Sequence, residues 1–378
     1  MNISYITTYN PLDIHNWSGL GYSIAKCLEN QGNDLSYIGN LEYELNLYLK
    51  YKYKLYRKLK LNFDITREKS IAKQYAQQAL QRISLNCDLI FSPGTIPIAY
   101  LESNKPKVFY TDATFAGMIN YYDEFSNLSK ETIYIGNKLE QKALDNCDLA
   151  IYSSEWAAET ALENYKVDVR KVKVVPFGAN LQWTFNSKEI RDLVLSKQLS
   201  TCHLLFIGVE WERKGGNKAI EITRILNSMG FKTTLHLVGI NDIPVNKLPD
   251  FVINHGFISK SNPEGVNLLK ELFEKSHFLV VPTIAEAYGL VFCEANAYAL
   301  PAISTNTGGI STIIKNNING MTFSLNSDVN EWCDYIFNLF QDHKLYRELC
   351  ISSYNEYTTR LNWDVAGKSL MKLIESIR

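Results

Sequence analysis

Short apolar runs alternate with amphipathic stretches along most of this chain. Four of the runs are ISYITTY (3–9), DLIFSPG (88–94), HLLFIGV (203–209) and HFLVVPT (277–283). Their length and composition are typical of strands buried in a parallel sheet. The stretches between the runs carry apolar residues at helical spacing, as Leu20, Ile24 and Leu28 do after the first run. Strands alternating with helices predict an α/β fold with parallel sheets.

The length of the chain predicts two such domains. A chain of 378 residues is too long for one ordinary core. The segment QWTFNSKEIRDLVLSKQLST (182–201) reads as a polar connector, so we place the domain boundary near residues 180–200. The first domain is expected at 1–180 and the second at 200–355.

Composition excludes several classes of protein. The chain has 39 basic and 40 acidic residues, so no overall field attracts nucleic acid, and none is expected as a partner. No signal peptide opens the sequence and no apolar run is long enough to span a bilayer, which predicts a cytoplasmic protein. The seven cysteines lack CxxC spacing and read as reduced core residues. The chain has no hydrolase, metalloprotease or P-loop motif and no Asp-x-Asp motif.

A basic and aromatic stretch occupies residues 48–61. Six lysines and arginines alternate there with tyrosines and leucines, and no acidic residue lies between Glu44 and Asp64. As a helix or an extended ribbon, this stretch would suit an anionic membrane face beside a lipid-linked acceptor. Single-stranded nucleic acid could use the same mixture of side chains. A solvated positive face of an ordinary helix is as good an interpretation as both together.

The stretch from His277 to Gly320 holds the strongest candidate site. A buried strand ends in a loop with Glu286 and Gly289, and the helix that follows carries Glu294. A second strand leads to Gly308 and Gly309 at the start of another helix. Both helix starts reach the sheet edge where open α/β folds bind ligands. The amides of Gly289, Leu290 and Val291, and those of Gly308 and Gly309, would suit a diphosphate.

Two glutamates in this stretch are candidates for binding hydroxyl groups. Glu294 lies among apolar residues, where a lone carboxylate is costly unless it meets donors, and ribose hydroxyls would supply them. Glu286 could hold the hydroxyls of a second polyol nearby. The alternative is that Glu294 pairs with a neighbouring lysine and Glu286 is solvated.

A cationic loop precedes the first helix of the second domain. Arg213 and Lys214 stand directly before Gly215 and Gly216. Two cations and two flexible residues at a helix start suit the charge that develops on a departing diphosphate. A solvated loop cation is the plain alternative for Lys214.

Two candidates lie in the first domain. Gly19 and Gly21 follow the first strand and could let backbone approach a donor diphosphate, or could simply serve a tight turn. Asp112 ends another strand, where substrate-contacting side chains collect. It could equally be a helix N-cap.

The order Glu286, seven residues, Glu294, with Gly289 between them and Gly308-Gly309 after an apolar strand, resembles the glutamate pair of the retaining glycosyltransferase family 4. The loop with Arg213 and Lys214 is similar to the family's diphosphate-binding loop. Two departures occur: Val209 and Glu210 replace the arginine that usually follows the strand's glycine, and Asp112 and its neighbours stand where many members have a histidine. The C-terminal stretch 362–378, which includes Trp363, resembles the family's terminal helix, which packs back on the first domain.

The resemblance implies a GT-B fold, in which two Rossmann-like domains face each other across a cleft. It implies transfer of a sugar from a nucleoside diphosphate donor, UDP- or GDP-linked, with no metal ion and no cofactor beyond that co-substrate. The acceptor would be a glycan, a lipid-linked molecule or another hydroxyl compound of surface polysaccharide or glycoconjugate synthesis. Catalytic roles would fall to Glu286, Asp112 and Lys214. Donor contacts would come from the residues Gly19, Gly21, Arg213, Lys214, Glu286, Gly289, Leu290, Val291, Glu294, Gly308 and Gly309.

Two rival functions stay open at this point. One is a sugar-nucleotide epimerase on the same fold, which would need no acceptor. The other is a non-catalytic GT-B module that binds a glycan or a partner enzyme.

Overall fold

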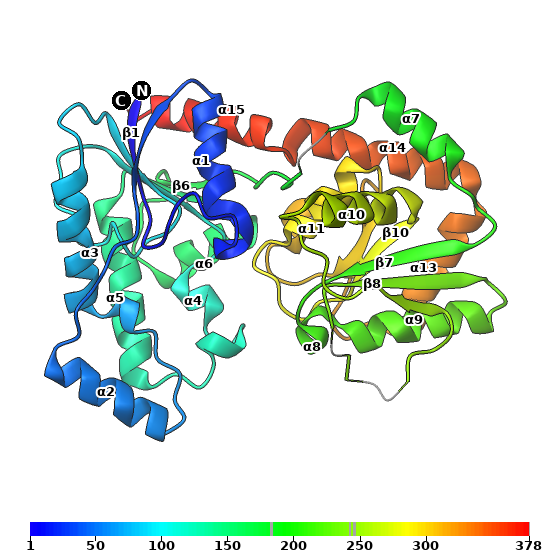
Figure 1. The fold of residues 1–378 in the computed structure, drawn as a ribbon, viewed down its shortest axis with the longest axis horizontal. Coiled ribbons are helices and arrows are strands. Elements are labelled where there is room, and N and C mark those ends of the chain that lie inside the picture. The colour runs from blue at the N-terminus through cyan, green and yellow to red at the C-terminus, as the bar shows by residue number, and fades with distance from the viewer. Residues whose placement is uncertain (182–183, 242, 245–246, 378) are drawn as a thin grey trace. The chain divides into compact units, whose positions relative to one another are not determined.

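The computed structural model describes residues 1–181, 184–241, 243–244 and 247–377. The chain divides into two compact units (Figure 1). The first unit comprises Met1–Asn180 together with Trp363–Arg378, and the second comprises Leu181–Asn362. Each unit is built around its own parallel sheet of six strands, so the predicted α/β fold is confirmed.

The sheet of the first unit has the order β2-β1-β3-β4-β5-β6, and each neighbouring pair of its strands is parallel. All residues of β3, β4 and β5 are buried, which explains why these segments read as continuous apolar runs. The strands are β1 (Asn2–Ile6), β2 (Asp34–Ile38), β3 (Leu89–Ser92), β4 (Lys107–Thr111), β5 (Leu149–Tyr152) and β6 (Val172–Val174).

Helices connect these strands, and side-chain caps fix several of their starts. Asn46, Ser129 and Ser154 accept hydrogen bonds from the first-turn amides of α2, α5 and α6. The helices are α1 (Leu20–Asn30), α2 (Leu47–Lys58), α3 (Lys69–Arg82), α4 (Phe115–Met118), α5 (Lys130–Asn146), α6 (Glu155–Asn164) and α15 (Trp363–Glu375), with 3-10 turns η1 (Asn16–Gly19), η2 (Ile65–Arg67) and η3 (Asp123–Phe125).

The C-terminal helix α15 belongs to the first unit and packs on α1 (Figure 1). The Sγ atom of Cys27 lies 3.1 Å from the carbonyl oxygen of Trp363. A Cβ atom at Gly367 would lie 2.9 Å from the same sulfur. The small residue therefore allows the close approach of the two helices.

The sheet of the second unit has the order β12-β11-β10-β7-β8-β9, again with parallel neighbours. In Figure 1, α9 lies below β7 and β8, and α10 lies above them. The strands are β7 (Cys202–Ile207), β8 (Thr233–Val238), β9 (Val252–Asn254), β10 (Phe278–Val281), β11 (Ala302–Thr305) and β12 (Gly320–Phe323), and the helices are α7 (Ser187–Ser196), α8 (Trp211–Lys214), α9 (Gly216–Ser228), α10 (Pro263–Lys275), α11 (Leu290–Ala297), α12 (Ile310–Ile313), α13 (Val329–Gln341) and α14 (His343–Arg360).

Two local differences from the sequence prediction occur in this unit. The polar connector contains α7, whose capping box is formed by Asn186 and Glu189 and which buries Ile190 and Val194. Polarity alone therefore hid a short amphipathic helix. Arg213 and Lys214 do not simply precede α9, because they form the end of the separate short helix α8.

A row of four histidines crosses the sheet of the second unit. The Nδ1 atom of His203 lies 3.2 Å from Nε2 of His236, whose Nδ1 atom lies 3.1 Å from Nε2 of His255. The backbone N–H of His203 donates to Nδ1 of His277 at 2.9 Å, and Nε2 of His277 lies 3.0 Å from the carbonyl oxygen of Gln198. Because a carbonyl oxygen only accepts, His277 is the neutral Nε2–H tautomer. The row is thus held together by neutral imidazoles.

Acid is expected to destabilise the second unit through this row. Burial, aided by nearby lysines, lowers the pKa of His203 to about 4 and those of His236 and His277 to about 3. Between these values and the unfolded pKa of about 6.5, the unfolded chain binds more protons, so stability falls as pH falls. At about pH 5 each of the three side chains costs up to about 2 kcal/mol relative to neutral pH.

Urea unfolding at about pH 7 and about pH 5 measures this loss. A His236→Gln variant starts less stable but should lose less free energy of unfolding between the two pH values than the parent does. His15→Gln, which lies outside the row and is exposed, serves as the control and should match the parent. An equal pH dependence in all three proteins would show that the row does not govern acid stability.

Among the described residues, no helix is long and apolar enough to cross a membrane.

Candidate active site

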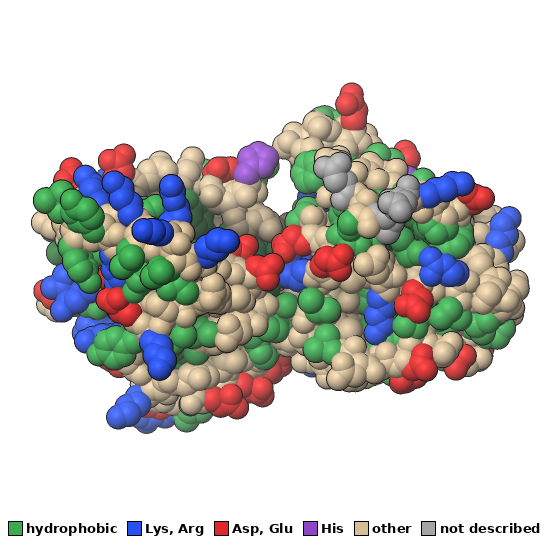
Figure 2. All heavy atoms as spheres, turned by 90° about the horizontal axis from the view of Figure 1, so that it is seen from below, with side chains coloured by type: hydrophobic (Ala, Val, Ile, Leu, Met, Phe, Trp, Pro, Cys, Tyr) green, Lys and Arg blue, Asp and Glu red, His purple; other side chains and the backbone are tan. Residues whose placement is uncertain are grey.

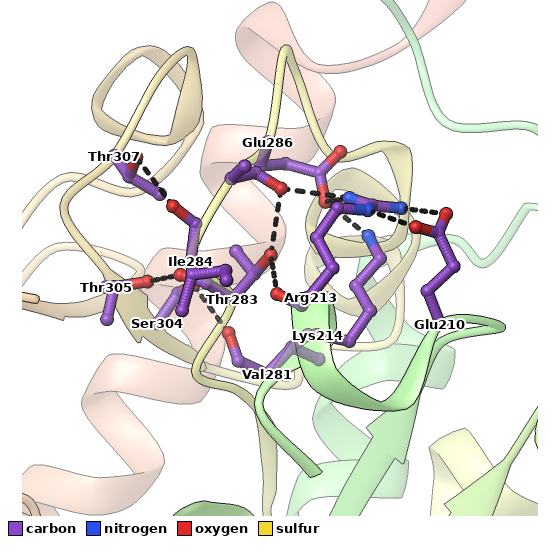
Figure 3. Close-up of polar contacts among 11 residues, drawn as sticks. Glu210, Arg213, Lys214, Val281, Thr283, Ile284, Glu286, Ser304, Thr305 and Thr307 are labelled. Carbon is purple, nitrogen blue, oxygen red and sulfur yellow. Dashed lines mark hydrogen bonds and ion pairs between the residues drawn. The ribbon is translucent and has the colours of Figure 1, made fainter. Parts of the chain in front are cut away.

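Lys214 and Glu286 meet although they are far apart in sequence. The Nζ atom of Lys214 forms an ion pair and hydrogen bond with Oε2 of Glu286 (Figure 3). The side chains are 12% and 11% exposed, so neither is the solvated group that the plain alternatives described. The structure therefore brings together two of the three predicted catalytic residues.

Arg213 is fixed in the same cluster from three directions. Its Nε and Nη2 atoms donate to the two carboxylate oxygens of Glu210 at 2.8 and 2.7 Å. Its Nη1 atom donates to the carbonyl oxygen of Ala285 at 2.9 Å and lies 3.7 Å from Oε2 of Glu286. These bonds lower the pKa of the Glu210 carboxyl, chiefly through hydrogen bonding from the guanidinium. Arg213 thus ties two loops together, and Lys214 is the better placed of the two cations to reach a ligand.

A set of hydroxyl groups holds the loop that carries Glu286. Thr283 Oγ1 lies 2.9 Å from the carbonyl oxygen of Arg213 and 3.0 Å from that of Ala285. Thr305 Oγ1 donates to the carbonyl oxygen of Thr283, and Ser304 Oγ donates to that of Val281 at 2.7 Å (Figure 3). β10, β11 and α8 are therefore joined directly below the glutamate, which limits how far its carboxylate can move.

Gly215 allows this close approach of the two loops. Its φ angle is +76°, and a Cβ atom there would lie 2.1 Å from the carbonyl oxygen of Pro282. Any other residue would be strained in conformation and would push the two loops apart. The glycine after the cation pair thus has a packing reason as well as a conformational one.

Glu294 lies on α11 and is almost fully buried, with 3% exposure. Its Oε1 atom is paired with Nζ of Lys260, a half-exposed side chain. Pairing with a lysine was the plain alternative for Glu294, and the structure shows that pair. Nothing in the sequence around either residue signals it, because the loop of Lys260 and helix α11 are distant along the chain. An exposed lysine can leave at modest cost, so the pair does not prevent Glu294 from accepting other donors.

The helix starts behave differently from each other. Gly289, with φ of +98°, is the N-cap of α11, and the amides of Leu290 and Val291 open its first turn. Gly308 and Gly309 precede the short helix α12, and the amide of Gly309 donates to the carbonyl oxygen of Glu286 at 3.1 Å. That amide positions the glutamate loop here. The start of α11 is therefore the stronger candidate for binding a diphosphate.

In the first unit, Asp112 lines a cavity of about 180 Å³. Thr114, and not Asp112, caps the following helix α4, so the N-cap interpretation of Asp112 is wrong. Tyr9 lines the same cavity, and its buried hydroxyl has no hydrogen-bond partner among the described residues. Burial and the nearby charge of Asp112 raise the pKa of Tyr9 to about 12, so it is a neutral donor. Arg67 and Glu140 lie 3.4 Å apart in the cavity lining.

Gly19 and Gly21 lie at the start of α1 in the same unit. A Cβ atom at Gly21 would lie 2.4 Å from Oη of Tyr9, and the Tyr5 hydroxyl donates to the Gly21 carbonyl oxygen at 2.6 Å. This supports packing as one reason for the glycine. Binding of a donor by Gly19 and Gly21 stays a prediction.

Several contributing residues were missed in the sequence. Lys260, Tyr9 and the hydroxyls of Thr283, Ser304 and Thr305 carry no motif that marks them. Only the pairing of Glu210 with Arg213 had a signal in the sequence, because an acidic and a basic residue three positions apart can pair on a helical turn. Among the described residues, no group of three or more His, Cys, Asp or Glu side chains could hold a metal ion.

Residues 201–342 match the family model described as glycosyl transferases group 1. The matched residues lie within the second unit. A curated relative, D-inositol 3-phosphate glycosyltransferase of Paenarthrobacter aurescens, is 23% identical over 54% of this chain and 51% of its own length. The chain thus spans about half the length of such curated relatives.

Solved structures of similar fold cover both units of the chain. Sucrose-phosphate synthase from Thermosynechococcus elongatus aligns over 100% of this chain and 99% of its own, with a TM-score of 0.69 and 16% identity. HepE from Anabaena, solved with UDP and glucose, aligns over 100% of both chains with a TM-score of 0.65 and 12% identity. The resemblance to glycosyltransferase family 4 and the GT-B fold are confirmed by these findings.

Proposed function

We propose that this protein is a retaining glycosyltransferase that moves a sugar from a UDP- or GDP-linked donor to a hydroxyl acceptor. The observation that carries the proposal is the contact of Lys214 with Glu286 beside the start of α11. The cation and the first-turn amides of α11 suit the diphosphate of a nucleotide sugar, and the carboxylate suits the hydroxyl groups of its sugar.

The donor would bind to the second unit with its diphosphate at the N-terminus of α11. Lys214 would leave part of its contact with Glu286 and neutralise the leaving diphosphate, while Arg213 keeps the loop in place. Glu286 would then accept hydrogen bonds from the sugar and stabilise its positive transition state. Glu294 would exchange Lys260 for the hydroxyls of the ribose. HepE, which was solved with UDP and glucose, supports a nucleotide sugar as the donor class.

The chemical step would be a displacement on one face of the sugar. The bond from the anomeric carbon to the diphosphate oxygen breaks, and its electron pair leaves with the diphosphate. The acceptor oxygen forms its bond to the same face, and its proton passes to an oxygen of the departing phosphate. This route needs no covalent intermediate with the protein.

The acceptor would bind in the cavity of the first unit. Tyr9 offers a hydroxyl donor and Asp112 a carboxylate in its lining, a combination that recognises hydroxyl groups of a glycan. Asp112 would position the acceptor hydroxyl, as predicted for a catalytic residue of this unit. The proposed acceptor is a glycan, a lipid-linked sugar or another polyol of surface polysaccharide or glycoconjugate synthesis.

Calorimetry with UDP and GDP tests the proposal first. We expect one of the two nucleotides to bind with a Kd in the micromolar range, about −7 to −8 kcal/mol, because the second unit would bind the donor through its nucleoside diphosphate. Binding of neither nucleotide would favour a non-catalytic module. A panel of sugar nucleotides then follows slow hydrolysis, which needs no acceptor. Conversion of a sugar nucleotide into its epimer, without release of nucleoside diphosphate, would replace the proposal with an epimerase.

A further inference from the structure

Helix α2 has one face built into the first unit. Leu49, Lys52 and Tyr56 are its buried residues and recur at helical spacing. The Nζ atom of Lys52 lies 2.6 Å from Glu68 and 2.8 Å from Glu131, and the Tyr56 hydroxyl donates to Glu131 at 2.6 Å. The inner face therefore fixes the orientation of the helix and uses one of its lysines internally.

The opposite face carries apolar and cationic side chains together. Leu47 and Tyr51 are 73% and 71% exposed, although exposed side chains of this size are costly to leave in water. Counted at 3.6 residues per turn, they share the outward side of the helix with Lys54 and Lys58. Lys50 and Arg57 lie on one flank, and Tyr48 and Leu55 lie on the other. We call the exposed residues of this helix and its end the α2 face: Leu47, Tyr48, Lys50, Tyr51, Tyr53, Lys54, Leu55, Arg57, Lys58, Leu59 and Lys60.

Figure 2 views the molecule from the side on which α2 lies in Figure 1. Hydrophobic and basic side chains are interspersed over that part of the first unit. The sequence contains no acidic residue between Glu44 and Asp64, and Glu68 and Glu131 are engaged by Lys52. The positive charge of the α2 face is therefore not cancelled from within its own helix.

The combination favours one partner over the others. Solvation alone does not account for three exposed leucines on this face. Binding of nucleic acid does not account for them either, because bases stack on aromatic rings and phosphates pair with cations. At a bilayer surface, leucine and tyrosine side chains enter the boundary between headgroups and acyl chains while lysines contact the phosphates. The two flanks of the helix divide these tasks.

We infer that the α2 face binds the surface of a bilayer rich in anionic phospholipid, with the helix axis lying in the plane of the membrane. Leu47, Tyr48, Tyr51 and Leu55 enter the interface, and the exposed lysines and Arg57 bind lipid phosphates. This contact would bring a lipid-linked acceptor to the enzyme, and it is independent of which donor the second unit uses.

Cosedimentation with vesicles tests the inference on the full chain. The protein should sediment with vesicles of phosphatidylcholine containing about 30% phosphatidylglycerol and remain in solution with phosphatidylcholine alone. Raising the salt from about 0.1 M to about 0.5 M should release most of it, because the shorter Debye length screens the attraction between the cationic side chains and the lipid phosphates. Failure of the parent protein to bind the anionic vesicles would overturn the inference.

Two double variants separate the contributions of charge and apolar contact. Lys54→Glu with Lys58→Glu should weaken vesicle binding by at least roughly 25-fold, since each basic residue at such a surface strengthens binding about fivefold. Leu47→Ser with Tyr51→Ser keeps the charge but should also lose most binding. The charge-matched control is Lys188→Glu with Lys372→Glu, two exposed lysines outside α2, and it should bind as the parent does.

Each remaining outcome decides the matter. Equal loss in the control variant would show that overall charge, and not the α2 face, drives binding. Tighter binding of the parent to a single-stranded oligonucleotide than to the anionic vesicles would assign the face to nucleic acid. Circular dichroism of every variant checks that the helix is retained, and all four substituted α2 positions are exposed, so the fold should be unaffected.

Discussion

Replacing Lys214 with alanine is expected to lower the turnover number for sugar transfer by about 100- to 1000-fold, which is the usual cost of removing one group that stabilises developing charge. Lys214 is the last residue of α8. Its side chain packs against Gly208 and pairs with Glu286. Without it, the leaving diphosphate would face Glu286 with Arg213 as the nearest cation, and Arg213 is already held by Glu210.

The measurement is steady-state transfer or slow donor hydrolysis, whichever the panel of nucleotides allows. Lys344→Ala, a highly exposed lysine of the same unit, is the matched control and should keep the parent rate. Lys214→Arg should retain part of the activity, because the charge remains but the donor geometry changes. Parent-like turnover in Lys214→Ala would remove this residue from catalysis, whereas an unfolded variant would be recognised by its melting curve.

Replacing Glu294 with glutamine is expected to raise the KM for the donor by about 10- to 100-fold while the turnover number changes little. A hydrogen bond to a charged group contributes about 1.5–3 kcal/mol, and glutamine keeps the size of the buried side chain but loses its charge. Because the ribose is remote from the bond that breaks, its contact is expected to act on binding more than on the chemical step.

Lys260→Ala is the informative partner experiment. If Lys260 pairs with Glu294 only while no donor is bound, its removal should leave the KM for the donor within a few-fold of the parent value. Calorimetry with the nucleotide checks both variants directly. Equal weakening by the two substitutions would show that the ion pair supports the structure of the site and that Glu294 does not bind the ribose itself.

The alternation of strands and helices was predictable because strands buried on both faces of a parallel sheet are short runs of mostly apolar residues. β3, β4 and β10 are fully buried, and each reads as a short apolar run. The helix α7 escaped prediction because a short helix that buries two side chains, Ile190 and Val194, leaves only a weak pattern. The sequence did not decide whether residues 48–61 form a helix or an extended ribbon. The structure shows the helix α2 over Leu47–Lys58, which contacts through Lys52 and Tyr56 orient on the first unit.

The candidate site was predictable where chemistry is local. Gly289 and Glu294 lie within the first two turns of one helix, and Arg213 and Lys214 are adjacent, so their spacing could be read directly. The partners of these residues could not be read. Whether Glu294 pairs with Lys260, or Asp112 caps a helix or lines a cavity, depends on loops that meet only in the folded chain.

By itself, the amino-acid sequence determined the α/β class, the position of the glycine-bearing helix starts and the family resemblance, because each depends on residues that are neighbours along the chain. Only the tertiary structure decided that Lys214 contacts Glu286, that the Tyr9 hydroxyl has no hydrogen-bond partner within the described part of the chain, and that one lysine of α2 points inward while the others face solvent. These facts follow from packing between distant segments, and the free energy of burying or pairing a charge is fixed by that packing and not by the order of residues.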